Sequence, residues 1–294
     1  MVYRQNILLA ILEVFDQELS ATFFQKILFL FSENQINRNF DFVPYKFGCF
    51  SFQAMADKSK LIRDGYLENT KGWKKANSDH PPFLSKLNET DRKILTKIQN
   101  QFADYSIDEL IRYIYIKYPY YAIYSEIASK YLTFQELESI QSLKPSNPHK
   151  SLMTIGYEGK SLEQFLNDLI QKNVRVLCDV RKNPLSRKYG FAKKTLRNAC
   201  ESVQIMYLHL PELGIPSKKR QNLKNQMDYD ILFLEYENTI LNEQKPKIHF
   251  LHTLLSNYKR IALTCYEASP KQCHRTRVAN AIHEIDNEIP VCHL

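Results

Sequence analysis

No apolar run in the sequence approaches the ~18 residues that a helix needs to cross a bilayer, so we expect no membrane segment. Residues 7–14 form the longest candidate, but Glu13 interrupts them and no small-residue cleavage site follows, so we also expect no signal peptide. The six cysteines include no C-x-x-C pair, which argues against a structural zinc site. These absences favour a cytoplasmic protein with reduced thiols, and we expect neither a metal nor a cofactor.

The chain is basic, with a formal net charge of +8. Most of the excess lies in the second half, because residues 151–294 carry a net charge of +6 and residues 1–150 only +2. Between Lys182 and Lys224 there are ten basic residues and two acidic residues. Such a stripe is typical of proteins that bind a polyanion, most often nucleic acid. A generally lysine-rich composition is the alternative explanation.

Residues 1–142 predict a mainly helical domain. Apolar residues recur at helical spacing over 7–15 and again over 23–31, with Ser20 as the N-cap of the second helix. A third helix is expected over 51–64, followed by the stretch DGYLE. This order loosely resembles winged-helix and antitoxin-like modules. The resemblance implies a domain that binds nucleic acid or a partner protein.

Residues 143–150 contain two prolines and little apolar content, which predicts a linker to a second domain over residues 151–294. In that domain short apolar runs, typical of buried strands, alternate with helical patterns. The predicted strands occupy residues 152–155, 174–180, 206–209 and 261–265. This alternation predicts an α/β domain, a parallel sheet with helices on both faces.

Polar and reactive residues follow three of these strands at their carboxyl ends, where open parallel sheets bind ligands. The clusters occupy residues 156–159, 179–181 and 265–267, and the last continues to residues 273–275 at the start of a helix. An unpaired charge near a core is penalised by several kcal/mol, so carboxylates at these positions need a partner or a function. Each could simply pair with a neighbouring arginine, but three strand ends with similar chemistry favour an active site.

Four stretches carry a family resemblance: TIGYEGKSLEQFL, VLCDVRKNPLSRKYGFAKKTL, YLHLPELGIPSKKR and ALTCYEASPKQCHRTRVA. With these stretches in this order, residues 151–294 resemble the family called domain of unknown function 488. The family name carries no activity, and the resemblance implies an α/β domain whose shared motifs are the strand-end clusters. Its signature positions fall on Gly156, Asp179, Arg181, Pro184, Ser186, Pro211, Leu213, Gly214, Glu267, Cys273, His274 and Arg275. Tyr157 stands where many members have a histidine, so we assign no proton transfer to that position.

Candidate roles follow from side-chain chemistry. Asp179 and Glu267 are the candidate catalytic carboxylates, which would activate water or stabilise an oxocarbenium-like sugar, and His274 is the candidate acid or base. The candidate phosphate-binding residues are Arg181, Arg187, Lys188, Lys193, Lys194, Lys218, Arg220 and Arg275. The candidates for stacking on a base drawn out of its helix are Tyr157, Tyr189 and Tyr266.

These residues predict a hydrolase that acts on nucleic acid, with DNA favoured over RNA. The most specific hypothesis is a DNA glycosylase that excises a base, including a modified base of invading DNA in antiviral defence. The first alternative is a non-catalytic DNA-binding regulator or an antitoxin-like nucleotide sensor.

The second alternative is a rhodanese- or phosphatase-like enzyme that uses a thiol on a small molecule. Cys265 ends a strand as the nucleophile of those enzymes does, but the first arginine after it is Arg275, too distant for their tight anion loop. Cys273, at a helix start, is the other candidate thiol. The spacing favours a carboxylate mechanism.

Overall fold

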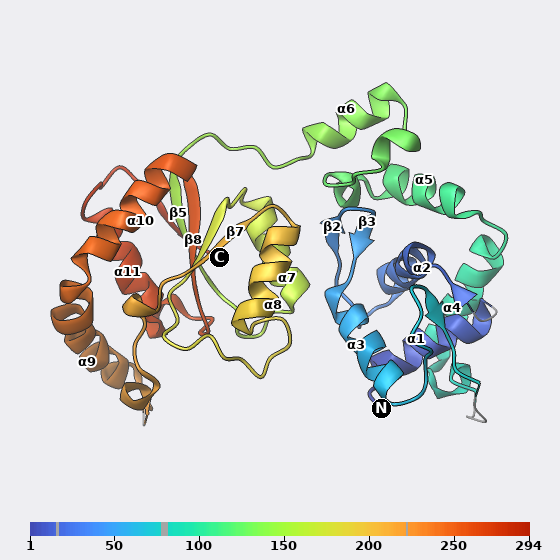
Figure 1. The fold of residues 1–294 in the computed structure, drawn as a ribbon, viewed down its shortest axis with the longest axis horizontal. Coiled ribbons are helices and arrows are strands. Elements are labelled where there is room, and N and C mark those ends of the chain that lie inside the picture. Colours follow the sequence, from blue (N-terminus) through green and yellow to red (C-terminus); the bar gives the residue numbers. More distant parts are fainter. Residues whose placement is uncertain (16–17, 78–81, 222) are drawn as a thin grey trace. The chain divides into compact units, whose positions relative to one another are not determined.

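The structure is a computed structural model that describes residues 1–15, 18–77, 82–221 and 223–294. The chain forms two compact units, Met1–Lys144 and Pro145–Leu294, which we describe separately (Figure 1). Across the described residues, no helix combines the length and the apolar character needed to cross a membrane.

The N-terminal unit is mainly helical, as the apolar periodicity predicts. Its helices are α1 (Tyr3–Val14), α2 (Ala21–Asn34), α3 (Phe52–Arg63), α4 (Glu89–Phe102), α5 (Ile107–Lys117) and α6 (Phe134–Ser142). Ser20 caps α2, because its hydroxyl oxygen accepts a hydrogen bond from the backbone nitrogen of Phe23 at 3.2 Å. Phe24 of the same helix stacks on Trp73 with 3.7 Å between the ring centroids, which packs α2 against the short strand that contains Trp73.

Short strand pairs complete this unit. β2 (Val43–Tyr45) and β3 (Gly48–Phe50) form a hairpin before α3, and β1 (Glu18–Leu19) pairs with β4 (Trp73–Lys74). A single antiparallel bridge between Leu67 and Lys75 brings the chain after α3 back beside this pair. The order of helices and strands is compatible with a winged-helix module, and that resemblance stays a prediction.

Within the described residues, the C-terminal unit contains a five-stranded sheet in which every pair is parallel. Its strands are β5 (Ser151–Gly156), β6 (Val176–Asp179), β7 (Met206–His209), β8 (Arg260–Cys265) and β9 (Val291–His293), in the spatial order β7-β6-β8-β5-β9. Every residue of β5, β6 and β8 is buried, which explains their apolar sequences. The edge strand β9 is an addition to the predicted set.

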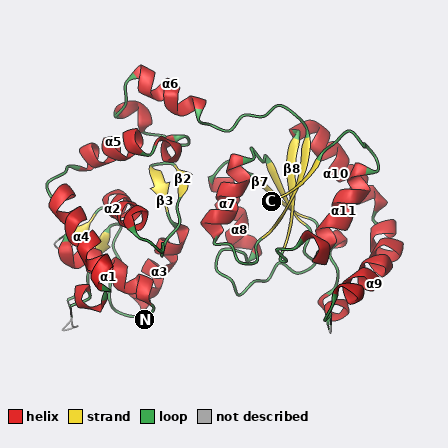
Figure 2. Cartoon of the chain, turned by 180° about the vertical axis from the view of Figure 1, so that it is seen from behind, coloured by secondary structure: helices red, strands yellow, loops and turns green. Residues whose placement is uncertain are grey.

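Helices cover both faces of this sheet, so the predicted α/β architecture is confirmed (Figures 1 and 2). α7 (Leu162–Gln171) and α8 (Lys193–Ser202) lie on one face, and α10 (Lys245–Tyr258) and α11 (His274–His283) lie on the other. α9 (Gln226–Tyr236) precedes α10 on that second side. The core between the sheet and these helices includes the fully buried residues Ile261, Leu263, Leu251, Leu255, Val278 and Ile282.

The direction in which the chain crosses the sheet reverses at β7. The connections that leave β5 and β6 lead toward the β7 edge, whereas those that leave β7 and β8 lead toward the β9 edge. β6 and β8 are neighbours, so the loops that follow these two strands run in opposite directions across the sheet. Open α/β sheets bind ligands in the crevice between two such loops. The register places Asp179 beside Thr264, so residues that follow the two strands share one edge of the sheet.

Candidate functional site

A pocket of about 450 Å³ lies at this edge of the sheet. The loops after β5, β6 and β8 form it together with residues 215–220. Its charged lining residues are the cations Arg181, Lys182, Arg187, Lys188 and Arg220 and the carboxylate Glu267. The excess of positive charge in a concave site favours an anionic ligand.

Asp179 and Arg181 form a buried ion pair at the end of β6. Arg181 donates hydrogen bonds from Nε to Oδ1 of Asp179 at 2.8 Å and from Nη2 to Oδ2 at 2.5 Å, and the hydroxyl of Tyr207 donates to Oδ2 at 2.6 Å. Burial by itself would lower the pKa of Arg181, but its hydrogen bonds to Asp179 and the charge of that carboxylate raise it. The carboxylate of Asp179 therefore holds the guanidinium in place at the pocket wall.

Glu267 follows β8 and brings a carboxylate to the pocket. It forms an ion pair with Arg220, and its side chain is 14% exposed. Its Oε2 lies 3.2 Å from the sulfur of Cys265, a distance at which a thiol donates a hydrogen bond. A partly shielded carboxylate beside cations can stabilise developing positive charge or take a proton from water.

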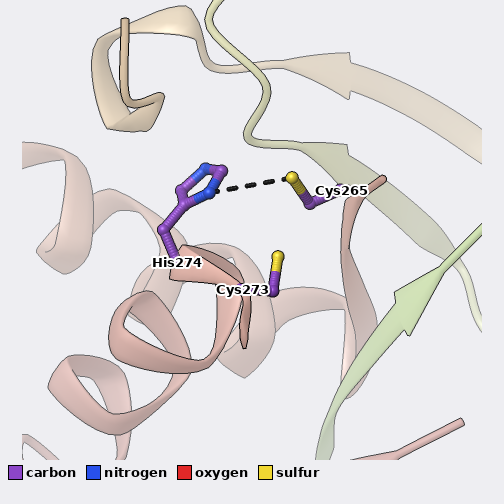
Figure 3. A group of neighbouring side chains, drawn as sticks. All are labelled: Cys265, Cys273 and His274. Carbon is purple, nitrogen blue, oxygen red and sulfur yellow. Dashed lines mark hydrogen bonds between the residues drawn. The ribbon is translucent and has the colours of Figure 1, made fainter. Parts of the chain in front are cut away.

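Cys265 also belongs to a cluster with Cys273 and His274 (Figure 3). The two sulfurs and a ring nitrogen lie within 4.8 Å of one another, and all three residues are buried. Burial by itself would raise the pKa of Cys265, but a hydrogen bond with Cys273 and the nearby charge of His274 lower it well below its ordinary value. Burial and the neighbouring Cys265 raise the pKa of Cys273. Cys265 is thus the more acidic thiol of the pair.

Arg275 lies beneath the loop that follows β8. It is fully buried, and its Nη1 and Nη2 donate to the carbonyl oxygens of Glu267 at 2.5 Å and Ala268 at 3.1 Å. Its Nε donates to the hydroxyl of Thr154 at 3.3 Å. A phosphate has no access to this guanidinium, so we assign Arg275 to positioning the loop in place of the predicted phosphate contact.

Two glycines let the loops of the site approach one another. A Cβ atom on Gly156 would lie 1.9 Å from the carbonyl oxygen of Glu267, and a Cβ atom on Gly214 would lie 2.1 Å from the backbone nitrogen of Lys182. Any larger residue at either position would displace backbone. The two loops that carry Glu267 and Lys182 therefore depend on these glycines.

The C-terminal unit, which holds this pocket, is similar to a known protein family. Residues 161–282 match the family Domain of unknown function DUF488. The resemblance seen in the sequence motifs is confirmed for the C-terminal unit, and the DUF488 region carries β6, β7, β8 and most of the pocket. Comparisons with curated proteins and with solved structures gave no match.

The structure brings about half of the predicted site residues into the pocket of the DUF488 region. Those that line it are Tyr157, Arg181, Arg187, Lys188, Arg220, Tyr266 and Glu267. Those that do not are Asp179, Tyr189, Lys193, Lys194, Lys218, His274 and Arg275. Asp179 and His274 lie behind the pocket wall, in contact with Arg181 and Cys265. Lys193, Lys194 and Lys218 are exposed, and their phosphate contacts stay predictions.

The three predicted stacking tyrosines differ in exposure. Tyr157 is 3% exposed and already stacks on Phe191, with 4.3 Å between the ring centroids. Tyr266 is 45% exposed and lines the pocket. Tyr189 is 39% exposed outside the pocket. Tyr266 is therefore the best placed of the three to stack on a ligand.

Some pocket residues were not among the predicted site residues. Cys265, which the sequence indicates only for the alternative thiol mechanism, lines the pocket, and its position at a strand end beside Glu267 is the available signal. Asn183 and Ser217 also line it, but isolated polar loop residues carry no recognisable pattern.

Proposed function

We propose that the C-terminal unit is a hydrolase that acts on nucleic acid, and that its reaction is the cleavage of an N-glycosidic bond, as in a DNA glycosylase. The observation that carries this proposal is the carboxylate of Glu267 in a pocket whose other charged residues are all cations. Phosphates would be bound by the cations, while the carboxylate is placed beside a sugar. A pocket of about 450 Å³ lies in the size range of small-molecule sites.

The cations that would bind the phosphates of the nucleic-acid backbone reach the pocket from different loops. Arg181 is held by Asp179, Lys182 and Arg187 are exposed, and Arg220 is partly exposed beside Glu267. Lys188 already has one hydrogen-bond partner within the protein, because its Nζ donates to the carbonyl oxygen of Tyr157 at 2.8 Å. Each phosphate that these cations contact releases counterions, so binding would weaken with salt.

The chemistry assigned to Glu267 is the stabilisation of charge and the acceptance of a proton. As the bond between the sugar carbon and the base nitrogen breaks, its electron pair leaves with the base and positive charge develops on the sugar. Water then forms the new bond to that carbon and one of its protons passes to Glu267. The same proton then passes, directly or through solvent, to the departing base, so Glu267 returns to a carboxylate. Tyr266 would stack on the extruded base, an interaction worth about 1–3 kcal/mol.

The test compares Glu267→Gln with a matched control, Glu237→Gln. Glu237 is a half-exposed carboxylate of the same unit that pairs with Arg277 outside this pocket. Protein is incubated with unmodified DNA and with heavily modified phage DNA, and released bases are measured by mass spectrometry. We expect Glu267→Gln to lose base release by several orders of magnitude while DNA binding in a gel assay is retained, and Glu237→Gln to behave as wild type. DNA binding without base release from either DNA would refute the proposal and favour the regulator.

A thiol mechanism is the second candidate, because Cys265 is one of the residues around the same cationic pocket and lies beside a carboxylate that can accept its proton. In that mechanism the sulfur of Cys265 forms a bond to the phosphorus of a phosphate ester as the phosphorus–oxygen bond to the leaving group breaks. The thiol proton passes to Glu267 and then to the departing oxygen, and water hydrolyses the sulfur–phosphorus bond. Intact-protein mass spectrometry after a rapid quench would detect the adduct. An adduct on Cys265 would replace the glycosylase proposal, and turnover without an adduct supports it.

A further inference from the structure

The cluster of Cys265, Cys273 and His274 has no part in the proposed reaction, yet it places three metal-binding side chains together (Figure 3). Cys265 comes from the end of β8, and the other two residues stand at the start of α11. All three residues are buried, so an ion bound among them would be largely shielded from solvent.

The orientation of His274 is the first observation in favour of a metal. Its Nε2 lies 2.9 Å from the carbonyl oxygen of Val180, and since a carbonyl can only accept, Nε2 carries the hydrogen. Nδ1 therefore faces the sulfur of Cys265, and a metal ion that displaces the proton held between these two atoms would meet a lone pair of Nδ1 there. Metal-binding histidines almost always donate their other ring nitrogen to a carbonyl or carboxylate in this way.

The spacing of the ligand atoms is the second observation. In a tetrahedral site with zinc–sulfur and zinc–nitrogen bonds of ordinary length, the sulfur and nitrogen stand about 3.6 Å apart. The sulfur of Cys265 lies 3.7 Å from Nδ1 of His274. All three ligand atoms fall within 4.8 Å of one another, so a small closure of the cluster would complete the three contacts.

We propose that Cys265, Cys273 and His274 bind one divalent cation of the zinc class, with the fourth position open to the pocket. Cys265 lines that pocket, and Oε2 of Glu267 lies 3.2 Å from its sulfur. Zinc sites with three protein ligands keep their fourth position for water, whose pKa the metal lowers. Binding releases one proton from each thiol, because the thiolate is the ligand. Metal binding is independent of the proposed function, and only the supply of a bound water to Glu267 rests on it.

The proposal departs from the expectation that the chain binds no metal. That expectation rested on the absence of a C-x-x-C pair, which detects only ligands that are close in sequence. Here the fold places Cys265, at the end of β8, close to Cys273 and His274 at the start of α11. A bound metal would also occupy the thiol of Cys265, which would then not be a free nucleophile.

The test measures zinc bound per chain. Full-length protein is purified without a metal-binding tag, kept reduced with a phosphine, exposed to zinc and dialysed, and its zinc is measured by plasma mass spectrometry. We expect about one zinc per chain for the wild type and background zinc for Cys273→Ser and His274→Ala. Cys200→Ser is the matched control, because Cys200 is a buried thiol of α8 outside the cluster, and it should keep its zinc. The proposal would be overturned if the wild type bound no zinc. It would also be overturned if the Cys273→Ser variant bound as much zinc as the Cys200→Ser control.

Two further measurements guard against variants that fail to fold. Titration of wild type with Co²⁺ should produce thiolate-to-cobalt charge-transfer absorption and the visible bands of four-coordinate cobalt, and their absence would overturn the proposal. Glu267→Gln should keep wild-type zinc, because its carboxylate is not one of the three ligands, and zinc loss in this variant would refute the open fourth position. Zinc-loaded wild type without base release would remove the proposed function and leave the metal site intact.

Discussion

Replacement of Asp179 by Asn should destabilise the C-terminal unit although the two side chains have nearly the same shape. Asp179 is fully buried, and it accepts hydrogen bonds from Nε and Nη2 of Arg181 and from the hydroxyl of Tyr207. In the variant an amide nitrogen would replace one oxygen and place hydrogens opposite some of these donors. Arg181 would keep its charge in a site where it is only 6% exposed.

The size of the effect follows from the loss of one partner of a buried ion pair, which costs about 3–5 kcal/mol. Tyr207→Phe is the matched control, because it removes one hydrogen bond to the same carboxylate and leaves the pair intact. A hydrogen bond to a charged group contributes about 1.5–3 kcal/mol, so the control should lose less. Since a domain is stable by only about 5–15 kcal/mol, the loss in Asp179→Asn would be a large part of the total.

The assay can separate the two units of the chain. Trp73 is the sole tryptophan and lies in the N-terminal unit, so its fluorescence during denaturant unfolding reports on that unit. Far-ultraviolet circular dichroism reports on both units. We expect Asp179→Asn to shift a circular dichroism transition to lower denaturant and to leave the Trp73 transition in place. A loss no larger than that of Tyr207→Phe would refute the reasoning.

Three further predictions concern the loops and surfaces of the site. Gly156→Ala would drive its Cβ into the carbonyl oxygen of Glu267, so we expect a lower Tm by calorimetry and a loss of base release; an unchanged Tm would contradict the required close approach. Arg187→Glu should flatten the salt dependence of DNA binding by about 0.9 slope units per lost phosphate contact, measured by anisotropy, whereas an effect confined to Lys193→Glu would move the binding surface to α8. Tyr266→Ala should weaken binding of single-stranded DNA by about 1–3 kcal/mol and Tyr266→Phe should not, and equal losses would argue against stacking.

The strands of the C-terminal unit differ in how well they can be predicted from the sequence. Residues of β8 are buried on both faces, so a continuous apolar run is enough to predict the strand from the sequence. β9 has only three residues, one of them His293, and no such pattern. It exists because of tertiary contacts, including a hydrogen bond from Leu152 to the carbonyl oxygen of Pro290 and one between Thr154 and His293. The residues of β9 and their neighbours in the sequence do not indicate these partners.

The candidate site shows the same limit. Asp179 and Glu267 look alike in the sequence, since each is a carboxylate at the end of an apolar strand. The structure separates them, because Asp179 is enclosed by Arg181 and Tyr207 while Glu267 faces the pocket. Tyr207 is supplied by β7, and its approach depends on the pairing of β6 with β7. The edge of the sheet could be predicted from strand ends, but the exposure of each carboxylate depends on neighbouring strands.

The buried guanidinium of Arg275 has a consequence for the entropy of binding. It joins the carbonyl oxygens of Glu267 and Ala268 to the hydroxyl of Thr154, so the loop that carries Glu267 is ordered before any ligand arrives. Fixing the backbone of one residue costs about 1–2 kcal/mol, and here folding has already met that cost. A ligand that enters the pocket therefore keeps more of its interaction energy as affinity. A lysine at this position has a single nitrogen for three acceptors and would leave the loop free to move.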